Sequence, residues 1–154
     1  PSVLAQYLPC LRPVSSYYSF SRSQWNGLNR NATPRVERGE WKLFEDRPNK
    51  PGWISRVAGS AIRFDVTFGP QPNLLIAYTK SYKGFGTADV SMTLTRPYQG
   101  HDRYDVRLRG MWSQKISQVA VHRVVEGFQP GFILPPNGTA SVVFTNNGPK
   151  FKIV

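Results

Sequence analysis

Apolar and polar side chains alternate at every second position between residues 61 and 69. Ile62, Phe64, Val66 and Phe68 are apolar, and two charged side chains and a threonine stand between them. Successive side chains of a β-strand point to opposite faces of a sheet, so this pattern predicts a strand with one face buried and the other in water. The chain is therefore constrained to a fold in which a sheet covers an apolar core on one side.

Similar short apolar segments recur along most of the chain. Strands are predicted at residues 41–44, 62–68, 73–80, 90–94, 104–108, 117–125, 132–134, 142–144 and 150–154. Glycines and prolines, 13 of each, punctuate the sequence, and it shows no helical pattern of useful length and no internal repeat. Roughly nine or ten short strands at this spacing predict an all-β fold, an antiparallel β-sandwich with a jelly-roll-like arrangement.

Three details of this sandwich follow from the local sequence. Residues 74–77 are apolar without alternation, which predicts a central strand that is covered on both faces. The valines of residues 117–125 predict a strand with a bulge. Asn146-Asn147-Gly148 is the strongest hairpin signal in the chain, so the strand at 142–144 is expected to pair with the strand at 150–154.

The length of 154 residues suits one domain with a real hydrophobic core. We place the sandwich at residues 39–154 and an irregular arm at residues 1–38. The arm is expected to pack on the domain, because it holds too many aromatic side chains for a free linker: Tyr7, Tyr17, Tyr18, Phe20 and Trp25. The chain begins without Met and ends within a strand pattern, so we expect it to belong to a longer protein.

The formal net charge is +11, from 20 Lys and Arg against 9 Asp and Glu. Such an excess favours an acidic partner, which is a nucleic acid, an acidic polysaccharide, an anionic membrane or an acidic protein, although a basic sheet face is often simply solvated. The densest group is Arg103, Arg107 and Arg109. No run of five like charges marks a nucleic-acid tail, so nucleic acid is the less favoured partner. No apolar stretch reaches the roughly 20 residues that a transmembrane helix requires.

The sequence contains no recognised catalytic motif and no phosphate or dinucleotide loop. His101 and His122 lie too far apart for metal-ligand spacing, so neither a metal nor another cofactor is expected. Glu45 and Asp46 are adjacent, and in a strand they would point to opposite faces, which is poor geometry for acid–base catalysis. These observations predict a chain with no catalytic machinery of its own.

Three residues bear on the cellular compartment. Cys10 is the only cysteine, so it is a buried apolar residue, a free thiol or half of a disulfide to a cysteine outside this segment. Asn31 and Asn137 begin glycosylation sequons, and Asn137 lies in a predicted exposed turn. The sequons favour an extracellular or cell-surface location.

Aromatic and basic residues occur together in three short blocks. The candidate ligand-binding residues of these blocks are Trp53, Tyr78, Lys80, Tyr82, Lys83 and Trp112, and Arg107 and Arg109 join them as candidates. Exposed Trp and Tyr rings stack on the apolar face of a sugar or on a base, and nearby cations suit a carboxylate or phosphate. The alternative is that these aromatic residues belong to the core, as most tryptophans of a β-sandwich do.

Four sequence blocks carry a resemblance to a known domain. They are Lys50-Pro51-Gly52-Trp53-Ile54-Ser55, Asp65-Val66-Thr67-Phe68-Gly69, Lys80-Ser81-Tyr82-Lys83-Gly84-Phe85-Gly86 and the ending Lys150-Phe151-Lys152-Ile153-Val154. Residues 38–154 resemble a domain of secreted plant and green-algal proteins of poorly defined function. That domain often accompanies a hydrolase-like region of the SGNH type. Its last strand commonly runs on into a cysteine, which implies a role for Cys10 as the partner of a downstream cysteine. The family's hydrolase residues have no counterparts here.

Three functions are compatible with these observations. The leading hypothesis is a non-catalytic extracellular or cell-surface module that binds an acidic glycan or a neighbouring wall or surface protein, within a larger assembly. The second is an accessory domain of an SGNH-type hydrolase whose catalytic part lies outside this segment. The third is a capsid-like or nucleic-acid-binding jelly roll, which the five scattered arginines of residues 1–38 support weakly.

Overall fold

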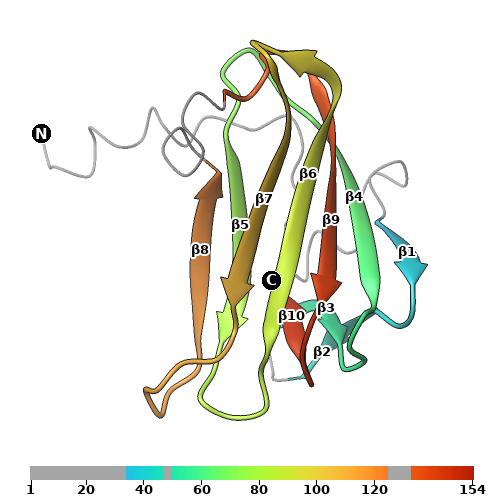
Figure 1. Ribbon diagram of the computed structural model, residues 1–154. Helices are drawn as coiled ribbons and strands as arrows, with labels where there is room; N and C mark the ends of the chain where they lie inside the picture. Colours follow the sequence, from blue (N-terminus) through green and yellow to red (C-terminus); the bar gives the residue numbers. More distant parts are fainter. Residues whose placement is uncertain (1–33, 47–49, 125–132) are drawn as a thin grey trace, which may run out of the picture.

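The computed structural model describes residues 34–46, 50–124 and 133–154. In these ranges all regular secondary structure is β-strand. Ten strands form two five-stranded sheets that face each other (Figure 1). Every pairing between two named strands is antiparallel. The prediction of an all-β antiparallel sandwich is therefore confirmed.

The strand order is that of a jelly roll with one extra strand on each sheet. Sheet A contains, in spatial order, β1 (Arg35–Arg38), β4 (Ala61–Thr67), β9 (Thr139–Asn146), β6 (Thr87–Tyr98) and β7 (His101–Arg109). Sheet B contains β2 (Lys42–Glu45), β3 (Pro51–Ser55), β10 (Phe151–Ile153), β5 (Leu74–Lys80) and β8 (Gln118–Val124). From β3 to β10 the chain changes sheet at every step except in the β6–β7 hairpin, which gives two interleaved four-stranded sheets.

The hydrophobic core lies between the two sheets and is built from their inward faces. Ile62, Phe64, Val66 and Phe68, whose alternation predicted β4, are all at most 7% exposed. The Phe64 ring meets the ring of Phe144 edge-on at 5.6 Å, so the pairing of β4 with β9 continues into side-chain packing. The strands β6, β7 and β9 bury alternate side chains in the same way.

One part of the expected arm is a strand. Arg35–Arg38, which the sequence analysis placed in the irregular segment 1–38, forms β1 and pairs with β4 at the edge of sheet A. All four residues are exposed, so no apolar alternation announces this strand. Ion pairs hold it instead, because Arg35 lies 2.8 Å from Asp65 and Glu37 lies 3.8 Å from Arg63. The aromatic residues predicted to anchor the arm lie outside the described residues.

The predicted hairpin at Asn146-Asn147-Gly148 is wrong, because β9 and β10 belong to different sheets. The side chain of Asn146 is fully buried, and its Nδ2 donates to Ser55 Oγ and to the carbonyl of Val57, both at 3.2 Å. These bonds tie the end of β9 to the end of β3 in sheet B. The turn therefore carries the chain from one sheet to the other.

The outer face of sheet B corrects two further predictions. β5 is an interior strand, as expected, but Leu75 is 53% exposed, so it is not covered on both faces by the described residues. Val119 and Val121 of β8 are 49% and 60% exposed. β8 pairs with β5 over seven consecutive residues without the predicted bulge. Apolar residues on both faces of these strands hide from the sequence which face meets the core.

A hydrogen bond joins the two sheets along the edge formed by β7 and β8. The hydroxyl of Tyr104 lies 2.8 Å from Nε2 of His122. Tyr104 is 1% exposed and His122 is half-buried. Burial lowers the pKa of His122 and raises the pKa of Tyr104, so both groups are held in their neutral forms at neutral pH.

This arrangement predicts that acid weakens the fold through His122. A histidine in the unfolded chain has a pKa of about 6.5, and the pKa of His122 in the folded chain is lower. As the pH falls below about 6.5, the unfolded chain therefore binds a proton at His122 before the folded chain does. The free energy of unfolding should therefore fall as the pH drops from 7 to 5. His122→Gln should flatten this dependence in urea titrations at each pH. Equal slopes for wild type and His122→Gln would contradict the prediction.

Candidate functional site

Two loops lie side by side at one end of the sandwich, at the lower left of Figure 1. Residues 80–86 leave β5 and lead into β6, and residues 109–117 leave β7 and lead into β8. We call these two segments together the loop end. A parallel bridge between Ser81 and Met111 joins them. Segments about 30 residues apart in the sequence therefore form one surface.

Backbone hydrogen bonds fix the two loops against each other. The Ser81 amide donates to the Gly110 carbonyl at 2.8 Å, and the Trp112 amide donates back to the Ser81 carbonyl at 3.2 Å. The hydroxyls of Ser81 and Ser117 are 2.7 Å apart. Because these partners come from the stems of both loops, the side chains at the tips are displayed from a rigid base.

A close approach of two glycines supports this base. A Cβ atom on Gly86 would lie 2.5 Å from the Cα of Gly148, in the turn after β9. The Gly86 amide donates to the Lys150 carbonyl at 2.9 Å, and its own carbonyl accepts from Gly110 at 2.9 Å. Only a residue without a side chain fits here, which gives the Gly84-Phe85-Gly86 block a structural reason.

The loop end is strongly basic. It contains Lys80, Lys83, Arg109 and Lys115 and no Asp or Glu. Within the described ranges, none of these four cations lies within 4.0 Å of a carboxylate, whereas Arg35, Arg63, Arg103 and Arg107 are each paired with one. Lys83, Arg109 and Lys115 are exposed, and the Lys80 ammonium lies 6.0 Å from the centre of the Tyr78 ring. The surface therefore has an uncompensated positive potential.

Apolar and aromatic side chains stand among these cations. Tyr82, Met111 and Ile116 are 48%, 59% and 53% exposed. Trp112 is half-buried, and its Nε1 donates to the carbonyl of Ile116 at 2.8 Å, which fixes the indole within its loop. Exposed apolar side chains gathered at one place mark an interaction surface more often than scattered ones do.

The structure brings together five of the eight residues proposed from the sequence. Lys80, Tyr82, Lys83, Arg109 and Trp112 all belong to the loop end. Sequence reasoning missed Met111, Lys115 and Ile116. The only signal for them is a run of apolar and basic residues without alternation between two predicted strands, and only the Ser81–Met111 bridge shows that they face the Tyr82 loop.

Tyr78 and Trp53 belong to the core instead of the site. Tyr78 is 6% exposed, and its ring stacks on Phe151 with centroids 5.7 Å apart and planes 16° apart. Burial raises its pKa. Trp53 is half-buried and packs against the same core. Register explains both positions, because Ile153 of β10 lies beside Trp53 of β3 and beside Tyr78 of β5, and all three point inward.

Arg107 lies on a different surface, the outer face of sheet A. It forms two hydrogen bonds to Asp89, of 2.6 Å from Nε and 3.0 Å from Nη2. The hydrogen bonds from Arg107 are the main cause that lowers the pKa of Asp89. Arg107 is thus a paired cation and does not extend the positive potential of the loop end.

Of the other sites predicted from the sequence, Asn137 lies in the described residues. Asn137 is exposed in the turn between Pro135 and Gly138, as expected for a sequon, and its glycosylation stays a prediction. Cys10 and Asn31 lie outside the described residues. In the described part of the chain, no three His, Cys, Asp or Glu side chains gather into a possible metal site. That part also contains no helix long and apolar enough to cross a membrane.

Comparison with known proteins gives only a remote likeness. No protein-family model matches the chain, and no characterised protein matches its sequence. One similar solved structure is CBM35 from Cellvibrio japonicus Abf62, with a TM-score of 0.39 and 14% sequence identity over 78% of this chain and 83% of that chain. At this distance the likeness assigns no residue and no ligand to this chain.

Proposed function

We propose that this chain is a non-catalytic binding module of an extracellular or cell-surface protein, and that its loop end binds an acidic polysaccharide. The observation that carries the proposal is a set of four cations that have no carboxylate partner among the described residues and that lie on two hydrogen-bonded loops. A polymer of carboxylated or sulfated sugars supplies the opposite charge at regular intervals. Long-range attraction then speeds encounter, and contacts at the loops hold the chain.

Tyr82 gives the site a preference for sugars over a simple counter-ion. Tyr82 is half exposed, and it lies next to Lys83 in the loop that the Ser81–Met111 bridge joins to residues 109–117. The face of a tyrosine ring packs against the apolar face of a pyranose, while its hydroxyl stays hydrogen-bonded to water or to the ligand. The neighbouring cations would then lie close to the acidic groups of the same polysaccharide.

The exposed Met111 and Ile116 favour a second candidate partner, an anionic lipid surface. Aliphatic side chains at loop tips enter the boundary between head groups and acyl chains, and nearby cations attract the lipid charge. We rank this candidate second because the exposed tyrosine and the resemblance of residues 38–154 to secreted domains both favour a glycan.

Affinity electrophoresis in gels that contain polygalacturonate or a sulfated glycan tests the proposal. Wild-type protein should be retarded at low salt, and retardation should fall as salt rises, because exposed charges are screened beyond about 8–10 Å at physiological ionic strength. Lys83→Glu with Lys115→Glu should weaken binding by about tenfold or more, or roughly 1.4 kcal/mol.

Two matched controls separate a site from general charge. Arg96→Glu with Arg123→Glu changes the net charge equally at the far ends of β6 and β8 and should preserve binding. Tyr82→Ala should weaken binding, whereas Tyr82→Phe, which keeps the ring, should retain it. Equal loss of binding in both double variants would show that net charge, and not the loop end, is responsible for binding. Binding to phosphatidylserine vesicles without binding to either glycan would replace the glycan with the lipid candidate.

A further inference from the structure

We propose that the outer face of sheet A is a second binding surface, separate from the loop end, and that it takes an uncharged polysaccharide. The inference does not depend on the proposed function, because it uses different residues on a different sheet. It rests on a hollow in that face, on the ion pairs formed by the four charged side chains that line the hollow, and on the hydroxyls of Ser91 and Thr145.

The hollow arises from side-chain size across neighbouring strands. The register places Thr145 of β9 beside Asp89 of β6, and Asp89 beside Arg107 of β7. One step along, Val143 lies beside Ser91, and Ser91 beside Asp105. The two central strands thus present short side chains, and β7 raises long ones at the edge. The result is an open depression of about 540 Å³ over these three strands.

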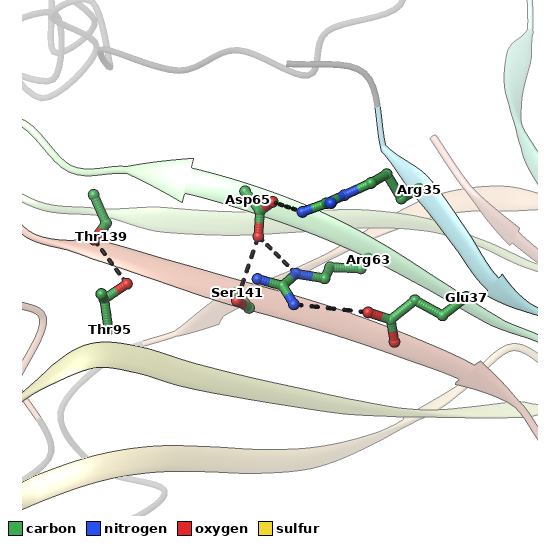
Figure 2. A network of polar contacts seen from close by, with 7 residues as sticks. All are labelled: Arg35, Glu37, Arg63, Asp65, Thr95, Thr139 and Ser141. Atoms are coloured by element: carbon green, nitrogen blue, oxygen red, sulfur yellow. Dashed lines mark hydrogen bonds and ion pairs between the residues drawn. The ribbon is translucent and has the colours of Figure 1, made fainter. Parts of the chain in front are cut away.

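A second set of polar side chains continues the surface over β4 and β1. Figure 2 shows Arg63 and Asp65 of β4 beside Ser141 of β9, with Arg35 and Glu37 of β1 reaching toward them. Asp65 accepts hydrogen bonds from Arg63 at 2.7 Å, from Arg35 at 2.8 Å and from Ser141 at 3.3 Å. Long side chains therefore border the short central ones on both sides.

The charges around the hollow are internally balanced. Arg107 pairs with Asp89, and Arg103 pairs with Asp105 at 2.7 Å. Asn147 adds a hydrogen bond of 2.6 Å to Asp89. Since two cations and two anions line the depression, it has no net charge to select a charged ligand. This is the electrostatic opposite of the loop end.

Paired side chains still have hydrogen-bonding capacity to offer. A guanidinium has five N–H donors and a carboxylate has about four acceptor positions, so each pair leaves donors and acceptors that face solvent. The pairing also holds these groups in place before a ligand arrives, which lowers the entropy lost on binding. Together with the hydroxyls of Ser91 and Thr145, they match a ligand rich in hydroxyl groups.

The composition of the hollow argues against a protein partner. The centre of a protein–protein interface is usually an aromatic or aliphatic anchor in a desolvated pocket. None of the residues that line the hollow is aromatic, and Val143 at its floor is half-buried. A hydroxyl-rich chain bound here would instead be held by hydrogen bonds distributed over the shallow surface.

The test is affinity electrophoresis against four soluble neutral polysaccharides: xyloglucan, galactomannan, glucomannan and mixed-linkage β-glucan. We expect retardation by at least one of them, and we expect it to persist in about 0.5 M NaCl, where ionic attraction is screened. Ser91→Trp fills the hollow from an outward-facing position and should weaken this binding by about tenfold or more, or roughly 1.4 kcal/mol.

The control is Thr79→Trp, which places the same side chain on the outer face of sheet B, and it should keep the binding. Unchanged melting temperatures for both variants show that the fold tolerates them. Lys83→Glu with Lys115→Glu should leave neutral-polysaccharide binding intact, which separates this inference from the function proposed for the loop end. Absence of retardation by all four polymers, or equal retardation of wild type and Ser91→Trp, would overturn the inference.

Discussion

Replacing Phe151 with alanine should destabilise the protein by about 3–5 kcal/mol, the usual cost of removing a large aromatic side chain from a packed core. Phe151 has no exposed surface and stacks on Tyr78 of β5. It also begins β10, whose three residues join β3 to β5 in sheet B. The variant therefore leaves a cavity where one sheet is closed. Urea denaturation followed by tryptophan fluorescence measures the loss.

Phe44 provides the matched control for this prediction. It lies on β2 of the same sheet but is 52% exposed, so Phe44→Ala should change stability by about 1 kcal/mol or less. Phe151→Leu preserves most of the volume and should cost less than about 1.5 kcal/mol. It keeps the comparison measurable when Phe151→Ala fails to fold. Similar losses for Phe44→Ala and Phe151→Ala would show that Phe151 does not have the role assigned to it.

Removing Asp46 should also destabilise the protein by about 3–5 kcal/mol, because it leaves a buried charge without a partner. The side chain of Lys152 is only 3% exposed, and its ammonium donates to the Asp46 carboxylate and to the Lys50 carbonyl. Lys150 donates to the same carboxylate at 3.0 Å. Asp46→Ala would leave the buried Lys152 ammonium without this carboxylate.

The pKa of Asp46 supports the same conclusion. Burial alone would raise its pKa, but the hydrogen bonds and charges of Lys152 and Lys150 outweigh burial and lower it. The stability that this pair provides is therefore present above the ordinary aspartate pKa of about 3.9 and is lost as the pH falls through the lower, folded value. In an acid titration, wild type should lose this stability as the pH falls, whereas Asp46→Asn should lack it at every pH.

A double substitution distinguishes a buried charge from ordinary packing. Asp46→Leu with Lys152→Met replaces the pair by apolar side chains and should recover most of the stability lost by Asp46→Ala. Asp105→Ala breaks the exposed pair with Arg103, whose side chains are 49% and 60% exposed, and should cost only about 0–1 kcal/mol. A double variant as unstable as Asp46→Ala would contradict the interpretation.

The sequence predicted those strands whose outer face is polar. Along β4, β6 and β7, apolar residues that face the core alternate with charged residues or hydroxyls that face water, and the observed burial follows this period. It also predicted β5 and β8 as strands, but it did not predict that their outer face would be exposed, as at Leu75 of β5 and Val121 of β8. Side-chain polarity alone does not say which of two apolar faces is covered.

The sequence also failed to predict how the chain connects the two sheets. Contacts between distant residues decide these connections, and they also decide the make-up of the candidate site. Asn147-Gly148 has the composition of a hairpin turn, yet the buried hydrogen bonds of Asn146 to Ser55 and Val57 commit the chain to the other sheet. In the same way, Tyr82 and Lys83 were evident as an aromatic–basic block. Their meeting with the Met111 loop depends on a tertiary bridge that leaves no local signal.

The short strand β10 also constrains the order of folding. β3 and β5 are neighbours of β10 and not of each other, and Phe151 lies opposite Ser55, far away in the sequence. Until this late segment arrives, both strands have unpaired backbone edges, which are templates for association with other chains. Contacts between such distant residues form slowly. A nascent chain on the ribosome would therefore expose an incomplete sheet until β10 emerges, and its open strand edges would be prone to association during that interval.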